Sequence, residues 1–113
     1  MIIAVLPNSS HAESLLNNLS EADFKLSTVS LIMSDQKIQK ALGQDAGPFK
    51  GVAPQDLAAR LVKAGLPQSD TAAYTNAVGQ GQVFFAMTPP PASQSAAAEM
   101  LQDASAQLIR VIP

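Results

Sequence analysis

The sequence predicts an α+β fold, chiefly because its two ends share one pattern. Residues 2–33 and residues 83–112 each pass from an apolar strand through an amphipathic helix to a second strand. Between them, about residues 35–80 form a helical middle that is interrupted by glycine and proline. At 113 residues the chain has the length of one domain, so residues 1–113 are expected to share a single core.

The helices of the two end units have the same spacing of apolar residues. The first helix is expected to begin at a capping box, in which Ser10 and Glu13 bond each other's backbone N–H groups. Apolar residues at positions i, i+3, i+4 and i+7 then give each helix one buried stripe. These residues are Ala12, Leu15, Leu16 and Leu19 in the first helix, and Ala97, Met100, Leu101 and Ala104 in the last.

The strands differ in a way that predicts their places in a sheet. Residues 2–6 and 83–87 are apolar throughout, as in central strands that are covered on both faces. Residues 26–33 and 108–112 include polar side chains, which is typical of half-exposed edge strands. Central first and third strands with the second and fourth outside are the arrangement of a ferredoxin-like sandwich. We therefore expect a four-stranded antiparallel sheet with helices on one face and a helical pair inserted between strands two and three.

The helical middle is expected to contain a loop followed by the helical pair. Residues 43–51 have the glycine and proline content of a loop. The first helix of the pair would start at Pro54 and stop at Gly65. The second would be capped by Ser69 or Asp70 and would carry Tyr74 on its apolar face. This pair is expected to lie across a sheet edge or over part of the open face.

Composition excludes several classes of function. The net charge is −2 and no basic cluster stands out, which argues against nucleic-acid and anionic-membrane partners because both require clustered positive charge. The chain has no cysteine and one histidine, so thiol chemistry is excluded and neither a metal site nor a cofactor is expected. The apolar start, residues 2–6, is too short for a signal peptide or a membrane span, so we expect a cytoplasmic protein.

Few residues qualify as parts of a functional site. His11 has no nucleophile or orienting partner in the sequence and is interpreted as an exposed residue of the first helix. Tyr74, the only tyrosine, either packs on the sheet or lines a pocket beneath the helical pair. Phe49 and Phe85 are the other candidate ligand-binding residues of that pocket. Core packing is nevertheless the favoured role of Phe84 and Phe85, because RNA-binding sheets of this topology add basic residues and a first-strand aromatic.

The apolar central strands raise a problem of coverage. Two helices can cover one face of the sheet, and an uncovered second face would exceed the apolar patch that soluble monomers usually tolerate. Either the helical middle covers this face or a second copy of the chain does. We therefore expect a homodimer, formed through the sheet face or through the edge at residues 108–112.

A set of turn and core residues gives the chain a resemblance to a known family. These residues are Gly65, Leu66, Pro67, Asp70, Tyr74, Val78 and Gly81, followed at once by an apolar strand. Together with the Ser-x-x-Glu helix start near the N-terminus, they resemble the bacterial general stress protein family with a YflT-type (heat-induced stress protein) domain. The resemblance implies a bacterial, cytoplasmic, stress-associated protein, and it implies no reaction.

Three functions remain open, and a non-enzymatic role ranks first. In that role the protein acts by self-association or by binding another protein, since catalytic roles cannot be filled from this sequence. The second is a small-ligand-binding regulatory module with its pocket near Tyr74, Phe49 and Phe85. The third is an enzyme of the dimeric α+β barrel kind, an analogy of fold alone that would require His11 or Tyr74 to line a cavity.

Overall fold

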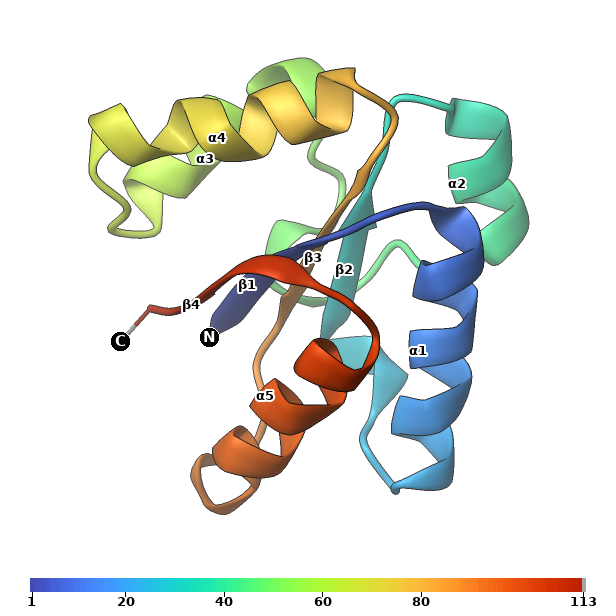
Figure 1. The fold of residues 1–113 in the computed structure, drawn as a ribbon. Coiled ribbons are helices and arrows are strands. Elements are labelled where there is room, and N and C mark those ends of the chain that lie inside the picture. Colours follow the sequence, from blue (N-terminus) through green and yellow to red (C-terminus); the bar gives the residue numbers. More distant parts are fainter. Residues whose placement is uncertain (113) are drawn as a thin grey trace.

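The computed structural model describes residues 1–112, which form an α+β fold around one four-stranded sheet (Figure 1). The sheet is antiparallel and open, with the strand order β2-β3-β1-β4. Its strands are β1 (Ile2–Leu6), β2 (Val29–Ile32), β3 (Val83–Met87) and β4 (Gln107–Val111). The helices are α1 (Ser9–Glu21), α2 (Gln36–Leu42), α3 (Leu57–Lys63), α4 (Gln68–Gly79) and α5 (Gln94–Asp103).

Strands β1 and β3 lie in the middle of the sheet and are buried along their whole length, as their apolar sequences predict. Successive side chains of a strand point to opposite faces, so each strand contributes to two layers of core. Ile2, Ala4 and Leu6 of β1 enter one layer, and Ile3 and Val5 enter the other. An uninterrupted apolar strand is therefore needed at these two central positions.

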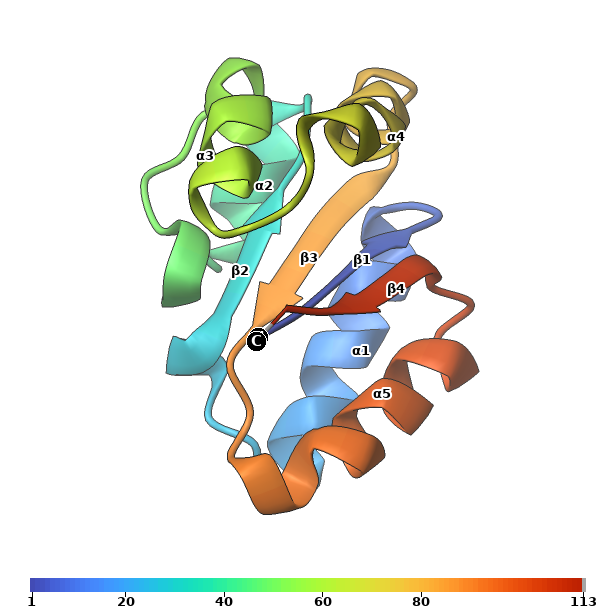
Figure 2. The same cartoon turned by 90° about the vertical axis from the view of Figure 1, so that its left-hand side faces the viewer.

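Helices α1 and α5 cover one face of the sheet (Figure 2). The stripe predicted for α1 is buried in full, and each fully buried leucine of this kind stabilises the fold by about 2 kcal/mol. Of the stripe predicted for the last helix, two residues are buried, and Met100 and Ala104 are half-buried. The buried members are Ala12, Leu15, Leu16 and Leu19 of α1, and Ala97 and Leu101 of α5.

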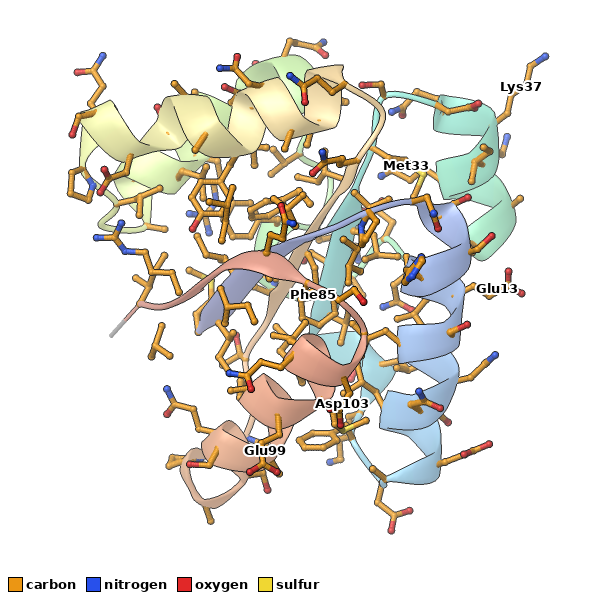
Figure 3. All side chains as sticks on the ribbon, in the orientation of Figure 1. Glu13, Met33, Lys37, Phe85, Glu99 and Asp103 are labelled. Atoms are coloured by element: carbon orange, nitrogen blue, oxygen red, sulfur yellow. The ribbon has the colours of Figure 1, made fainter. Side chains whose placement is uncertain are left out.

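The start of α1 differs from the expected capping box. The cap is Asn8, whose Oδ1 accepts a hydrogen bond from the backbone N–H of His11 at 3.0 Å. Asparagine caps helices as well as serine does, and Asn8 comes earlier in the chain. Ser10 consequently lies inside the helix, and Glu13 points outward from α1 into solvent (Figure 3).

The second face of the sheet is covered by the helical middle of the same chain. Helices α1 and α5 thus lie on one face and α3 and α4 on the other, so of the two covers considered for this face it is the helical middle that is present. Because this face is occupied, a second copy is not needed to cover it, and the sheet face is not available for dimerisation. The covering residues include Phe49, Leu57 and Leu61 of α3, Leu66, and Tyr74, Ala77 and Val78 of α4.

Helix α2 has no buried residue, and its Leu42 is half-buried against the core beneath α1 and α5. Asp35 caps it, with its Oδ1 accepting from the backbone N–H groups of Lys37 and Ile38 at 3.0 and 3.1 Å. Gly43 ends it in a left-handed conformation, the usual stop signal of a helix. Among residues 1–112, no helix combines the length and the apolar composition that crossing a membrane requires.

Candidate functional site

The outer edge of β2 is covered by residues 44–49, which run beside it. The side-chain amide of Gln44 donates to the backbone carbonyl of Val29 at 2.8 Å. The backbone N–H of Phe49 donates to Ser30 Oγ, also at 2.8 Å. β2 was expected to be a half-exposed edge strand, and this cover is the reason that it is buried along its length.

The outer edge of β4 is open. Within residues 1–112 this strand pairs with β1 and with no other strand (Figure 2). Ile112 exchanges two backbone hydrogen bonds with Met1, at 2.7 and 3.0 Å. Because the bonding side alternates along an antiparallel strand, the N–H and C=O groups of Val111 point away from β1. Val111 and Leu108 are 49% and 44% exposed, so the open edge also carries apolar surface.

Strand β4 contains a bulge where it pairs with β1. Arg110 lies opposite Ile3 and Gln107 lies opposite Val5, so β4 has one residue more than β1 in this interval. Leu108 lies within the bulge and has a φ of 54°, a left-handed conformation that is unfavourable for a large side chain. Contacts from elsewhere in the fold must therefore hold this segment in place.

Helix α4 supplies those contacts. Asp70 and Tyr74 lie one helical turn apart on α4 and so share a face. Asp70 Oδ2 lies 2.7 Å from Arg110 Nη1, and the Tyr74 hydroxyl donates to the carbonyl of Leu108 at 2.7 Å. The ion pair is exposed and contributes little to stability, whereas the tyrosine is buried. We call these four residues the β4 clamp.

Burial shifts the pKa of the tyrosine in this clamp. It raises the pKa of Tyr74 above its ordinary value of 10.0, and the opposed charges of Arg110 and Asp70 are smaller influences that lower and raise it, respectively. The hydroxyl therefore keeps its proton near neutral pH and can donate to the carbonyl of Leu108.

Replacing Tyr74 with phenylalanine should destabilise the protein by about 1–3 kcal/mol, because the carbonyl of Leu108 loses its partner. The wild type should also lose stability as the pH rises past 10.0, since the unfolded state then releases the tyrosine proton while the folded state retains it. Tyr74→Phe has no hydroxyl to titrate at this position, so it should not show this part of the loss of stability at high pH. The free energy of unfolding in urea, measured for both proteins at about pH 7 and about pH 11, gives the difference. An equal loss of stability at high pH in both proteins would contradict the burial of the hydroxyl.

Three aromatic rings fill the space between the sheet and the helical middle. The ring centroid of Phe84 lies 5.0 Å from that of Phe49 and 6.0 Å from that of Tyr74, with an edge-on arrangement in both pairs. The Arg60 guanidinium lies over the Phe49 ring, 5.0 Å from its centroid. Phe49 and Tyr74, two of the predicted ligand-binding residues, are 1% and 3% exposed and are packed into this layer.

Phe85, the third predicted ligand-binding residue, lies on the opposite face of the sheet, in the core beneath α1 and α5 (Figure 3). Neighbouring residues of a strand face opposite ways, so Phe84 rather than Phe85 joins Phe49 and Tyr74. The three predicted residues therefore do not form one site. Alternation along β3 is the signal in the sequence that could have identified Phe84.

His11 lies in the first turn of α1, half-buried, with its Nδ1 atom 2.9 Å from Asn8 Oδ1. This contact ties its ring to the helix cap. Residues 1–112 contain no group of three or more His, Asp or Glu side chains placed to hold a metal ion.

A concavity of about 560 Å³ lies elsewhere, at the end of the sheet where α1 leads into β2 and β3 leads into α5. Residues 22–25 and Thr28 line one side of it, and residues 88–90 and Ser93 line the other. We call this concavity the end pocket. Nothing in the sequence pattern predicts it, because its two sides come from segments that are far apart in the chain.

Comparisons with known proteins assign no family to this chain. No protein-family model, no curated protein and no solved structure matches it. The resemblance to the general stress protein family therefore stays a prediction, and function has to be argued from the geometry.

Proposed function

We propose that this protein is a non-enzymatic, self-associating protein that forms a homodimer by pairing β4 with the β4 strand of a second copy. The difference between the two sheet edges carries this proposal. Residues 44–49 cover the edge of β2, whereas the edge of β4 is open within the described chain. Unpaired N–H and C=O groups along an edge are a template for another strand, and monomeric proteins usually protect them.

A second copy suits this edge for reasons of symmetry and charge. Two β4 strands would run antiparallel about a two-fold axis, the commonest symmetry of soluble oligomers, and would join two sheets into one. Arg110 is the charged residue of β4, and Asp70 of the same chain already neutralises it. Two copies can therefore approach without bringing together unpaired like charges, and pairing would cover Val111.

The bulge limits the length of this pairing. Leu108 departs from the extended backbone, so regular pairing would be confined to residues 109–112. A short contact of this kind buries little surface, and we expect a dissociation constant on the order of micromolar.

The same proposal includes a fold class and a cellular context. The strand order, and the position of α1 and α5 on one face, support a ferredoxin-like sandwich in which α2, α3 and α4 are an insertion. The residues at 65–81 that resemble the general stress protein family support a role in the bacterial cytoplasm under stress. The protein would then act through assembly and not through chemistry.

Sedimentation equilibrium over a range of protein concentrations tests the dimer. The wild type should pass from the monomer mass to the dimer mass as concentration rises. Val111→Lys should weaken association at least about tenfold, because pairing would desolvate the new charge at the edge. Val62→Lys is the matched control: Val62 is 45% exposed, similar to Val111, but it lies on helix α3 and should leave the dissociation constant unchanged.

A second variant distinguishes strand pairing from simple hydrophobic contact. Val111→Pro removes an N–H group that points away from β1, so the monomer should keep its circular dichroism spectrum while the dimer is lost. A wild type that stays monomeric at every concentration would overturn the proposal. So would a dimer that survives both substitutions at position 111.

A further inference from the structure

The end pocket is built from two connections that meet at one end of the sheet (Figure 2). One runs from the end of α1 through Asp23, Phe24 and Lys25 to Thr28, and the other runs from Thr88 to the start of α5. At about 560 Å³, its volume falls within the range of pockets that hold small ligands. None of the residues of the β4 clamp lines it, so this inference is independent of the dimer.

The walls of the end pocket are held in place by hydrogen bonds to backbone carbonyl groups. The N–H of Thr88 donates to the carbonyl of Thr28 at 3.1 Å and so ties one wall to the other. The Thr28 hydroxyl donates to the carbonyl of Lys25 at 2.7 Å, and the N–H of Phe24 donates to the carbonyl of Leu19 at 2.9 Å. A pocket whose walls are fixed in this way loses little conformational entropy on binding.

Two residues of opposite charge are among those that line this pocket. Asp23 and Lys25 flank Phe24 in the chain, and all three are lining residues. Within residues 1–112 the only ion pair joins Arg110 to Asp70, so Asp23 and Lys25 are not paired with each other. Both charges are exposed to solvent and are available to a ligand.

The remaining lining is partly apolar and partly hydroxylic. Phe24 is half-buried against the core beneath α1 and α5, and Pro89 and Pro90 lie across from it. Thr88 and Ser93 add neutral hydroxyl groups. A ligand with only a negative charge would be repelled by the carboxylate of Asp23, and a ligand with only a positive charge would be repelled by the ammonium of Lys25. A purely apolar molecule would displace water from both charged groups without replacing the hydrogen bonds that the water makes to them.

We propose that the end pocket binds a free α-amino acid with an apolar side chain. The carboxylate of Asp23 would accept from the ligand's ammonium group, and the ammonium of Lys25 would donate to the ligand's carboxylate. The side chain of the ligand would pack against Phe24 and the two prolines. A zwitterion with an apolar body is the ligand class that satisfies both charges and the apolar wall together.

Titration of the ¹⁵N-labelled protein with L-phenylalanine, followed by NMR, tests this site. Saturable shifts should be confined to the backbone amides of the non-proline residues within 22–28 and 88–95, with a dissociation constant on the order of 1 mM or below. Two analogues serve as ligand controls: 3-phenylpropionate lacks the ammonium group, and 2-phenylethylamine lacks the carboxylate. Each should bind at least about tenfold more weakly than phenylalanine.

Variants of the two charged residues test whether each of them binds the ligand group of opposite charge. Asp23→Asn and Lys25→Gln should each weaken phenylalanine binding about tenfold. Asp23→Asn should also bind 3-phenylpropionate more tightly than the wild type does, because the repelling carboxylate is gone. Asparagine tolerates the left-handed backbone at position 23, where φ is 66°, so this variant should fold. Lys37→Gln is the matched control, since Lys37 extends into solvent from α2 (Figure 3) and should not change binding.

The ligand series on the wild type decides the proposal even where a variant fails to fold. Absence of saturable shifts up to about 50 mM phenylalanine would overturn it. Shifts located away from residues 22–28 and 88–95 would do the same. An analogue that binds as tightly as phenylalanine would show that the two charges do not act together, which also overturns the assignment.

Discussion

Replacing Gly47 with alanine should destabilise the protein by about 2–5 kcal/mol and uncover the edge of β2. A Cβ atom at this position would lie 2.8 Å from the backbone carbonyl carbon and oxygen of Thr28, and 2.9 Å from Ser30 Oγ. The backbone of Thr28 leads directly into β2 and cannot move aside cheaply. Gly47 also has a φ of 72°, which strains any residue with a side chain. Residues 44–49 would therefore have to move away from the strand that they cover.

Gly51→Ala is the matched control for this change. Gly51 has a similar φ of 76°, but a Cβ atom there would meet nothing within 4 Å. Its replacement should cost about 1 kcal/mol, the cost of the backbone conformation alone. Urea unfolding compares the two variants, and sedimentation equilibrium should show added self-association for Gly47→Ala because a second edge is then open. Equal costs for the two variants would contradict the close approach at Gly47.

Replacing Phe84 with alanine should destabilise the protein by about 3–5 kcal/mol, since the substitution leaves a cavity between the sheet and the helical middle. Phe84 is fully buried and contacts the rings of both Phe49 and Tyr74. The measurement is the free energy of unfolding in urea. The total free energy of unfolding of a small domain is only about 5–15 kcal/mol. A variant that no longer unfolds in a cooperative transition would therefore also agree with this prediction.

Phe84→Leu separates the loss of volume from the loss of the aromatic contacts. Leucine refills most of the space, so its cost should fall well below that of alanine, and about 1 kcal/mol of it should reflect the edge-on ring contacts. Loss of Phe84 should also loosen Tyr74 and bring its pKa down toward 10.0, which the absorbance of the only tyrosine reports directly. A cost below about 1 kcal/mol for Phe84→Ala would contradict the packing described here.

Much of the architecture could be predicted because its signals are local. The apolar runs at residues 2–6 and 83–87 identified the two central strands, and both are central and buried. The helical spacing identified the buried stripe of α1 in full. Periods of two and of about four residues follow from the geometry of strands and helices, so they can be recognised within a short stretch of chain.

The candidate site was harder to predict because it depends on which face and which edge each residue occupies. Phe49 and Tyr74 pack in the same core layer, but Phe85 lies on the opposite face of the sheet and Phe84 takes its place. The predicted cap of α1 was wrong for a related reason. Asn8 and Ser10 are both residue types that cap helices well, and local sequence does not distinguish between them. Local rules allow such alternatives, and the packing of the whole chain selects one.

The α+β class, the central strands and the helices that cover one face could be predicted from the sequence, because these features depend on residue spacing along each element. How each edge of the sheet is covered, and where a pocket forms, depends instead on contacts between elements. Gln44 reaches Val29 to protect β2, Tyr74 reaches Leu108 to hold the bulge of β4, and Thr88 reaches Thr28 to close the end pocket. Each of these contacts joins residues far apart in the chain. Such contacts exist only after the layers have packed, and no periodicity within a single element specifies them.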